Sequence, residues 1–172
     1  MDEGIPKEDW ESEIDDTILL SDVEIQTLIT DSKNLPKTLF RDLRLKDKEN
    51  RSYKEYELEA QSNSGRTFKI LIRVNTINRK DFSVILLYIR KNKRQHILRR
   101  YNGIHIHRNK IEKNRFRDFH IHFATQRYQE KGHQIEGYAE ITNSYSTWQE
   151  ALNKMLEDCN FKGKDSFLSR FE

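Results

Sequence analysis

The chain has 172 residues, of which 35% are hydrophobic and 34% are charged, and its formal net charge is +3. This length predicts one domain with a modest core. We expect neither a membrane partner nor a secretory leader, because no apolar run reaches ~18 residues and no basic-then-apolar segment opens the chain. The single Cys159 excludes an internal disulfide framework, so a reducing compartment, by default the cytoplasm, is expected.

The charge is divided unevenly along the chain. Residues 1–34 hold eleven Asp and Glu against two Lys, a balance of −9, whereas the remainder holds 29 Lys and Arg against 17 acids, or +12. This division predicts a disordered acidic arm over residues 1–18 and a basic body that favours polyanions such as RNA or DNA. Two alternatives stay open: the acidic arm aids only solubility, or it folds back and masks the basic surface.

Helical signals come first in chain order. Ser21 and Glu24 form a capping-box pattern before an apolar stripe from Val23 to Ile29, which predicts a helix that ends near Pro36. A second short helix is predicted over residues 37–43.

From Tyr53 onward the hydrophobic period changes to two, which indicates strands. The predicted strands begin at Tyr53 and then cover 68–74, 82–89, 96–100 and 138–141, with a turn at 63–65 and a break at Asn102-Gly103. A last helix is predicted over about 146–159, capped by Ser146 and Gln149, followed by a C-terminal tail over 162–172.

The order of helix, strands and helix predicts an α+β domain over residues 19–161. The short polar turns leave no room for helical crossovers, so we expect an antiparallel β-sheet meander with an N-terminal helix and a C-terminal helix.

Four of the six histidines lie in two similar stretches, IHIHR at 104–108 and FHIHF at 119–123. Alternate residues of a strand share a face, so each pair of histidines is expected to point away from its apolar neighbours. If the two stretches pair antiparallel with His105 opposite His122 and His107 opposite His120, all four imidazoles gather on one face. A one-residue slip would separate the pairs, and residues 102–115 forming a long loop is the other possibility.

Clustered imidazoles serve three kinds of chemistry. His105, His107, His120 and His122 are therefore candidate ligands of a divalent metal ion, candidate acid–base catalysts, or phosphate-binding cations at low pH. The alternative is a solvent-exposed sheet face that happens to carry histidine. Weaker candidates nearby are Asp118, which is expected to share the face of His120, and His133 and Glu136 from a following loop.

The surroundings of the histidines are basic, with eleven Lys and Arg against one Glu over residues 90–117. Basic residues neutralise backbone phosphates, and exposed aromatic residues stack on unpaired bases. An ordinary charged loop is the alternative. The predicted nucleic-acid-binding residues are Arg99, Arg100, Tyr101, Arg108, Arg115, Arg117, Arg127 and Tyr128.

Several short motifs resemble a bacterial family of small proteins to which no activity is assigned. The matching stretches are Asp81 to Val84, Arg100 to Gly103, Phe119 to Tyr128, and Tyr145 through Leu152, within a resemblance that covers about residues 55–161. Because that family has no assigned activity, the resemblance implies no particular reaction.

Two looser similarities bear on function. The layout is similar to that of small toxins of bacterial toxin–antitoxin pairs, although their adjacent His-His is replaced here by His-Ile-His. That similarity implies a His-dependent RNase-like activity and an antitoxin or other protein partner. The His-hydrophobic-His spelling also resembles nicking and replication-initiation nucleases, in which a downstream tyrosine attacks; here the tyrosines are Tyr128, Tyr138 and Tyr145.

Two functions are therefore expected from the sequence. The first is a cytoplasmic nucleic-acid-directed protein, an RNase-like toxin acting on phosphodiesters through the four histidines. The second is a non-enzymatic binding protein of phage or mobile-element type that inhibits a nucleic-acid machine.

Overall fold

The structure is a computed structural model that describes residues 19–36, 41–43 and 53–165. The predicted acidic arm over residues 1–18 and most of the predicted C-terminal tail lie outside these residues. The described elements, in chain order, are α2 (Asp22–Thr30), β1 (Lys33–Asn34), β2 (Arg41–Leu43), β3 (Tyr53–Ser62), β4 (Thr67–Asn75), β5 (Phe82–Ile89), β6 (Gln95–Arg108), β7 (Arg115–Phe123), α3 (Gln126–Glu130), β8 (Tyr138–Ile141), α4 (Trp148–Asp158) and β9 (Phe161–Lys162).

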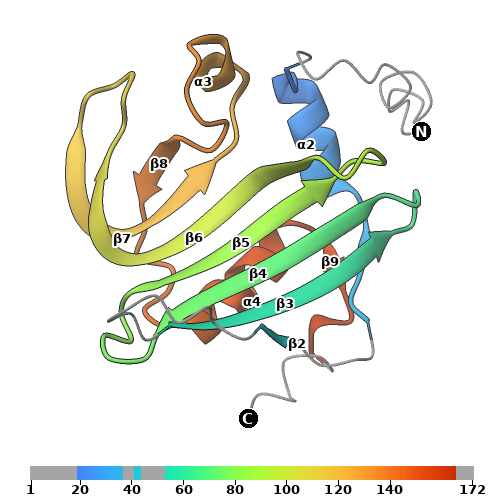
Figure 1. Cartoon of the computed structure of the whole chain (residues 1–172), viewed down its shortest axis with the longest axis horizontal. Helices are drawn as coiled ribbons and strands as arrows, with labels where there is room; N and C mark the ends of the chain where they lie inside the picture. Colours follow the sequence, from blue (N-terminus) through green and yellow to red (C-terminus); the bar gives the residue numbers. More distant parts are fainter. Residues whose placement is uncertain (1–18, 37–40, 44–52, 166–172) are drawn as a thin grey trace.

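The strands form one curled, nine-stranded sheet (Figure 1). Its order is β8-β7-β6-β5-β4-β3-β1-β9, and β2 pairs with β3 at the same edge as β1. All pairs are antiparallel except β1 with β9. This antiparallel-rich sheet with three short helices in the described residues agrees with the predicted α+β class.

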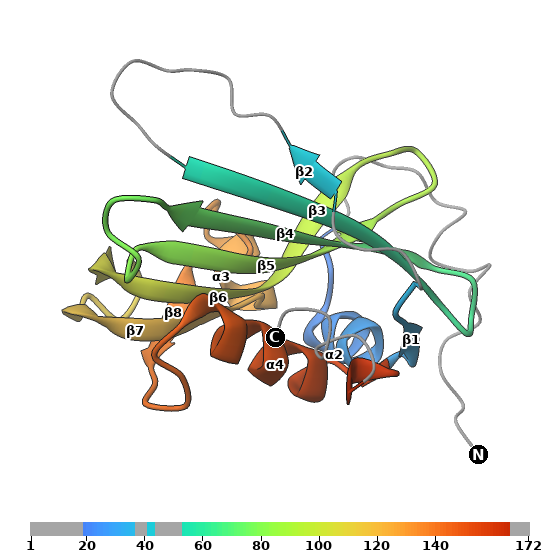
Figure 2. The same cartoon turned by 90° about the horizontal axis from the view of Figure 1, so that it is seen from below.

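One face of the sheet is covered by α2 and α4 (Figure 2). On β4, Phe68, Ile70 and Ile72 alternate with less buried residues and are fully buried in the core that these helices cover. Leu152 and Met155 of α4 are at most 1% exposed in the same core. Burying each such side chain stabilises the fold by roughly 1.5–3 kcal/mol, so the apolar period of two determines which face the helices cover. The other face of β4 to β7 holds the histidines, together with both polar and apolar side chains.

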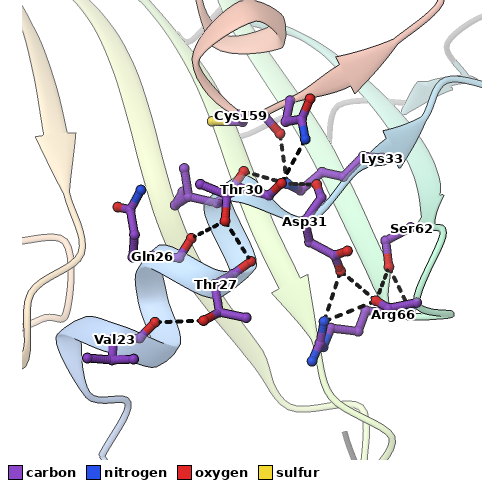
Figure 3. Close-up of polar contacts among 12 residues, drawn as sticks. Val23, Gln26, Thr27, Thr30, Asp31, Lys33, Ser62, Arg66 and Cys159 are labelled. Atoms are coloured by element: carbon purple, nitrogen blue, oxygen red, sulfur yellow. Dashed lines mark hydrogen bonds and ion pairs between the residues drawn. The ribbon is translucent and has the colours of Figure 1, made fainter. Parts of the chain in front are cut away.

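Lys33 joins three elements beneath the sheet (Figure 3). Its side chain is fully buried, and its Nζ donates to the carbonyl oxygens of Ile29, Asp31 and Cys159 at 2.8–2.9 Å. Burial lowers the pKa of Lys33 to about 8. The lysine therefore satisfies carbonyl groups at the C-terminal ends of both α2 and α4, which helix geometry leaves without partners.

Local predictions differ in outcome. The Ser21–Glu24 capping box is present at the start of α2. Residues 41–43 form strand β2, so the predicted helix over 37–43 is wrong there, and residues 37–40 lie outside the described part. The cap of α4 is Thr147, which accepts from the backbone N–H of Glu150, rather than Ser146. Lys162 belongs to β9, where the tail was expected to begin.

The described helices include none that is both long enough and apolar enough to cross a membrane.

Candidate metal centre

Strands β6 and β7 form the predicted hairpin, but the predicted register is wrong. His120 lies opposite Asn102 and His122 lies opposite Arg100, whereas His105 pairs with Asp118 and His107 with Phe116. Strand β6 also continues through Asn102-Gly103, where a break was predicted. In the observed register the two histidine pairs lie at different heights along the hairpin, so neither pair lies directly opposite the other.

A β-bulge between Asn102 and His105 restores the common face. The bulge places one extra residue in β6, so the side chains that share the face of His120 and His122 change from Arg100 and Asn102 to His105 and His107. All four imidazoles therefore lie on one face, as expected. This arrangement depends on both the observed register and the bulge, and strand alternation alone does not predict it.

Gly103 makes this bulge possible. A Cβ at position 103 would lie 1.9 Å from the carbonyl oxygen of Lys80, and the adjacent Ile104 N–H donates to that same oxygen at 2.8 Å. Only glycine permits this backbone approach. The turn before β5 therefore supports the strand that carries His105 and His107.

The imidazoles are in direct contact with one another. The ring centroid of His107 lies 4.5 Å from that of His122 and 5.5 Å from that of His120, and the latter two are 5.0 Å apart. His107, His120 and His122 each offer one nitrogen, and these nitrogens lie within 4.8 Å of one another. His105 packs on His120 at 4.9 Å but is not a member of this trio.

Backbone carbonyls fix the tautomers of two members of the trio. Nδ1 of His120 lies 2.7 Å from the carbonyl oxygen of Asp118, and Nδ1 of His122 lies 2.8 Å from that of Glu136. Because a carbonyl oxygen only accepts, both Nδ1 atoms carry the proton. The lone pair of each ring is therefore on Nε2, and that of His120 accepts from the Nδ2 amide of Asn102 at 3.4 Å. Asp118, a weaker candidate in the sequence, orients His120 through its backbone carbonyl.

Asn109 fixes the third tautomer. Its Oδ1 accepts the backbone N–H of Ala139 at 2.8 Å, and its Nδ2 donates to the carbonyl of the same residue at 2.9 Å, which determines how the amide is oriented. Nε2 of His107 lies 2.9 Å from that Oδ1 and must donate to it. The lone pair of His107 is consequently on Nδ1.

Burial keeps the rings of His105, His120 and His122 neutral. It lowers the pKa of His120 to about 4 and that of His122 to about 3, and the neighbouring histidines lower the pKa of His122 further. Burial also lowers the pKa of His105. At neutral pH these rings lack the proton that a general acid donates, whereas neutral imidazole is the form that ligates metals.

A pocket of about 290 Å³ opens on the cluster. Its cationic lining residues are Arg100, Arg108 and Lys110, and its carboxylate is that of Glu136, which is 5% exposed. Nη2 of Arg100 lies 3.4 Å from Oε1 of Glu136. His107 and His122 line the pocket, while His120 is fully buried behind it. The excess of cations suits an anionic ligand.

His105 occupies a different environment beside the trio. Its Nε2 lies 3.0 Å from Nδ2 of Asn102, whose Oδ1 accepts from the hydroxyl of Ser83 at 2.8 Å. The buried Nδ1 of His105 has no hydrogen-bond partner among the described residues, and Oδ1 of Asp81 is 3.9 Å away.

The two tyrosines expected to contact nucleic acid are both fully buried. The hydroxyl of Tyr101 donates to Asp158 at 2.8 Å, and that of Tyr128 donates to Glu112 at 2.6 Å. Neither ring is exposed for stacking on a base, and both hydroxyls already have carboxylate partners. Their structural role is to join β6 to α4 and the β6–β7 turn to α3.

The predicted arginines are spread over both faces. Arg100 and Arg108 line the histidine pocket. Arg99 packs against the ring of Phe123 at 4.5 Å, and strand alternation places Arg115 and Arg117 on the face opposite to His120. Arg127 forms an ion pair with Glu112.

Two positions that hold the histidines were not predicted. Asn102 and Asn109 are each 1% exposed, although asparagine is mostly a surface residue. Asn102 was interpreted as a turn residue, and Asn109 follows the HIHR stretch with no local signal that would distinguish it from a loop asparagine.

Comparison of the chain with family models, curated proteins and solved structures gave no match. The geometry of the site is therefore the basis for inferring function.

Proposed function

We propose that His107, His120 and His122 bind one divalent transition-metal ion, and that this centre acts on phosphodiester bonds of nucleic acid. The observation that carries the proposal is that all three rings are anchored by acceptor-only partners, which leaves one lone pair on each ring. Such outer hydrogen bonds are the usual support of metal-binding histidines. Three histidine ligands with an open fourth position are typical of catalytic zinc sites.

The ligand chemistry favours zinc or a neighbouring first-row ion. Neutral imidazole suits zinc, copper, iron and nickel, whereas magnesium and calcium prefer oxygen ligands. A bound ion of this kind lowers the pKa of coordinated water and polarises a phosphoryl oxygen.

The residues around the trio fit a phosphate group. Arg100, Arg108 and Lys110 would neutralise charge on the phosphate oxygens, which is the main requirement for stabilising a phosphoryl-transfer transition state. Glu136 places a carboxylate in the same pocket and can accept a proton from an attacking water molecule. Arg100 holds that carboxylate in place.

The biological setting follows from the sequence. An RNase-like toxin with an antitoxin or other protein partner agrees with the basic histidine region, and the lone, fully buried Cys159 favours the cytoplasm. Both parts of this setting are predictions that rest on the sequence.

The direct test is cleavage of labelled RNA and single-stranded DNA by protein purified without a His tag. We expect cleavage that requires a divalent ion, stops on addition of a chelator, and is lost in His107→Ala and His122→Ala. His96→Gln is the matched control, because His96 lies against Tyr88, outside the cluster, and glutamine can still accept from Arg90.

Two results would contradict the proposal. One is that both substrates remain intact with every first-row ion added. The other is cleavage that persists in the histidine variants. Binding of nucleic acid without cleavage, unchanged when all four histidines are replaced, would instead favour the inhibitory binding protein.

A further inference from the structure

A second basic pocket lies at the opposite end of β6 from the histidines. It has a volume of about 440 Å³ and is formed by the β3–β4 turn, β4 and the β5–β6 turn. Its charged lining residues are Glu59, Arg66, Lys69, Arg90, Lys91 and Lys93. Five cations against one carboxylate make it more strongly basic than the histidine pocket.

The β5–β6 turn holds its lysines at an exposed tip. The backbone N–H of Lys93 donates to the carbonyl of Arg90 at 2.9 Å, and that of Arg90 donates to the carbonyl of Arg94 at 2.9 Å. Lys93 has φ of 72°, and Lys91 and Lys93 are both exposed. The tight turn therefore directs two ammonium groups to the rim of the pocket.

Two of the lining cations pair with carboxylates. Arg66 pairs with Asp31 at 3.1 Å and Lys69 with Glu57 at 2.5 Å. Arg90 donates through Nε to His96, whose pKa burial lowers to about 4, so at neutral pH that partner is uncharged. The charge of Arg90 consequently adds to that of the turn lysines.

The two pockets open on the same face of the sheet. Lys69 lies opposite Leu87, and two residues earlier in β5 Ile85 lies opposite Arg100, which in turn lies opposite His122. Residues of one strand that are two apart share a face, so this path runs from the turn pocket to the histidines. The span from Gln95 to Arg100 lies alongside Ile89 to Ile85 of β5, because β6 has one extra residue there, and four steps of ~3.3 Å give a separation of roughly 13 Å.

We propose that the turn pocket binds the phosphate backbone of the same single-stranded polynucleotide whose reactive group enters the histidine pocket. This inference rests on the proposed function. A separation of roughly 13 Å corresponds to about four nucleotides at the 3.4 Å spacing of a stacked strand and to fewer in an extended strand, so the ligand is an oligonucleotide rather than a mononucleotide. A histidine pocket of about 290 Å³ is at the small end of ligand sites and admits one unpaired nucleotide.

The test compares two variants that change the net charge equally. Lys91→Glu with Lys93→Glu alters the turn pocket, and Lys131→Glu with Lys162→Glu alters two exposed lysines that line neither pocket. Fluorescence anisotropy measures binding of an octamer of RNA, the same octamer of DNA, and a dinucleotide, with chelator present to prevent cleavage. Circular dichroism verifies the fold of each variant.

We expect the turn variant to lose octamer affinity by at least about tenfold at about 50 mM salt, and the slope of log K against log salt to fall by about 1.4, which is ~0.7 for each of two lost phosphate contacts. Dinucleotide affinity should not change, because a dinucleotide cannot reach the second pocket. A loss with both octamers identifies the shared phosphate backbone, and a loss with RNA alone identifies RNA as the ligand.

Octamer affinity that is unchanged in the turn variant, or that falls equally in the control variant, would overturn the inference. Metal content is measured on the same protein preparations before chelator is added, so the two proposals can fail separately. A chain without metal whose octamer binding depends on Lys91 and Lys93 contradicts the metal centre and supports the turn pocket. A metal-loaded chain whose octamer binding does not depend on Lys91 and Lys93 supports the metal centre and contradicts the turn pocket.

Discussion

At the scale of single residues, Asn109 shows why the histidine cluster was only partly predictable. The sequence placed each pair of histidines on one face of its strand because H-x-H spacing in a strand requires it. It could not show which nitrogen of each ring is available, since that depends on the amide of Asn109 and the carbonyls of Asp118 and Glu136. Two of these contacts are to backbone carbonyls, and the third is to an amide whose orientation is set by the backbone of Ala139, so no side-chain pattern records them.

Replacing Asn109 with Ala should weaken metal binding by roughly 10- to 100-fold, the usual effect of losing an outer hydrogen bond to a ligand. The change also leaves the backbone N–H of Ala139 without its partner, which costs about 1–3 kcal/mol of stability. Competition with a zinc-binding dye measures the affinity. Asn114→Ala is the control, because Asn114 contacts the Asn109 amide without touching His107. Equal affinities in the two variants would show that the tautomer of His107 is not what matters.

The stability of the metal-free protein should fall as the pH is lowered from about 6.5 towards 4. In the unfolded chain a histidine binds a proton near pH 6.5, whereas in the folded chain the pKa is about 4 for His120 and about 3 for His122. The unfolded state therefore binds more protons in this window, and each histidine lowers the free energy of unfolding by roughly 1.4 kcal/mol per pH unit. Urea unfolding at pH 7 and pH 5 measures this dependence. His122→Gln should reduce it, and an unchanged dependence in that variant would refute the explanation.

At the scale of elements, the alternation of side chains predicts the strands but not the bulge in β6. The strands over 68–74, 82–89 and 138–141 follow directly from their apolar period, and each is present. The register of β6 with β7 does not follow, because one extra residue at Gly103 shifts the phase of every side chain beyond it. The glycine predicted a break because the sequence does not show what it is needed for. Its lack of a side chain lets the backbone lie against the Lys80 carbonyl, which is distant in sequence.

Gly103→Ala should both destabilise the protein and abolish metal binding. The added methyl group would overlap the carbonyl oxygen of Lys80, so the bulge must move at a cost of about 1–3 kcal/mol or more, and His105 and His107 move with it. Gly132→Ala is the control: it has φ of 74° with nothing within 4 Å of an added Cβ, so only the left-handed backbone penalty of about 1–2 kcal/mol applies. Thermal unfolding and metal content are measured for both. Retention of metal by Gly103→Ala would contradict the role given to the bulge.

At the scale of the whole molecule, the α+β class and the basic character of the body could be predicted. The contacts that join β1 to β9 and α2 to α4 could not. The short strands β1 and β9 pair in parallel, and Lys33 bridges the ends of α2 and α4 across 126 residues of sequence. The sequence does not show which of its 31 Lys and Arg residues is buried. The position of Lys33 is determined only when the two helix ends meet.

Lys33→Met should lower stability without affecting the metal centre. Methionine fills similar space but leaves three carbonyl oxygens without their donor, each costing about 1–3 kcal/mol unless water reaches it. The melting temperature should therefore fall by several degrees while metal content stays at the level of the unaltered protein. Lys131→Met, at an exposed lysine, is the matched control. A melting temperature equal to that of the control would show that the bridge contributes nothing.

The most direct test of the metal centre is the metal stoichiometry of protein purified without a His tag, incubated with excess zinc and desalted. Elemental analysis should find about one ion per chain in the unaltered protein and in His96→Gln, as expected for a single three-histidine site. His107→Ala, His120→Ala and His122→Ala should each retain none. An unaltered protein that holds no ion, or an ion that persists when all three histidines are replaced, would contradict the assignment of these residues as ligands.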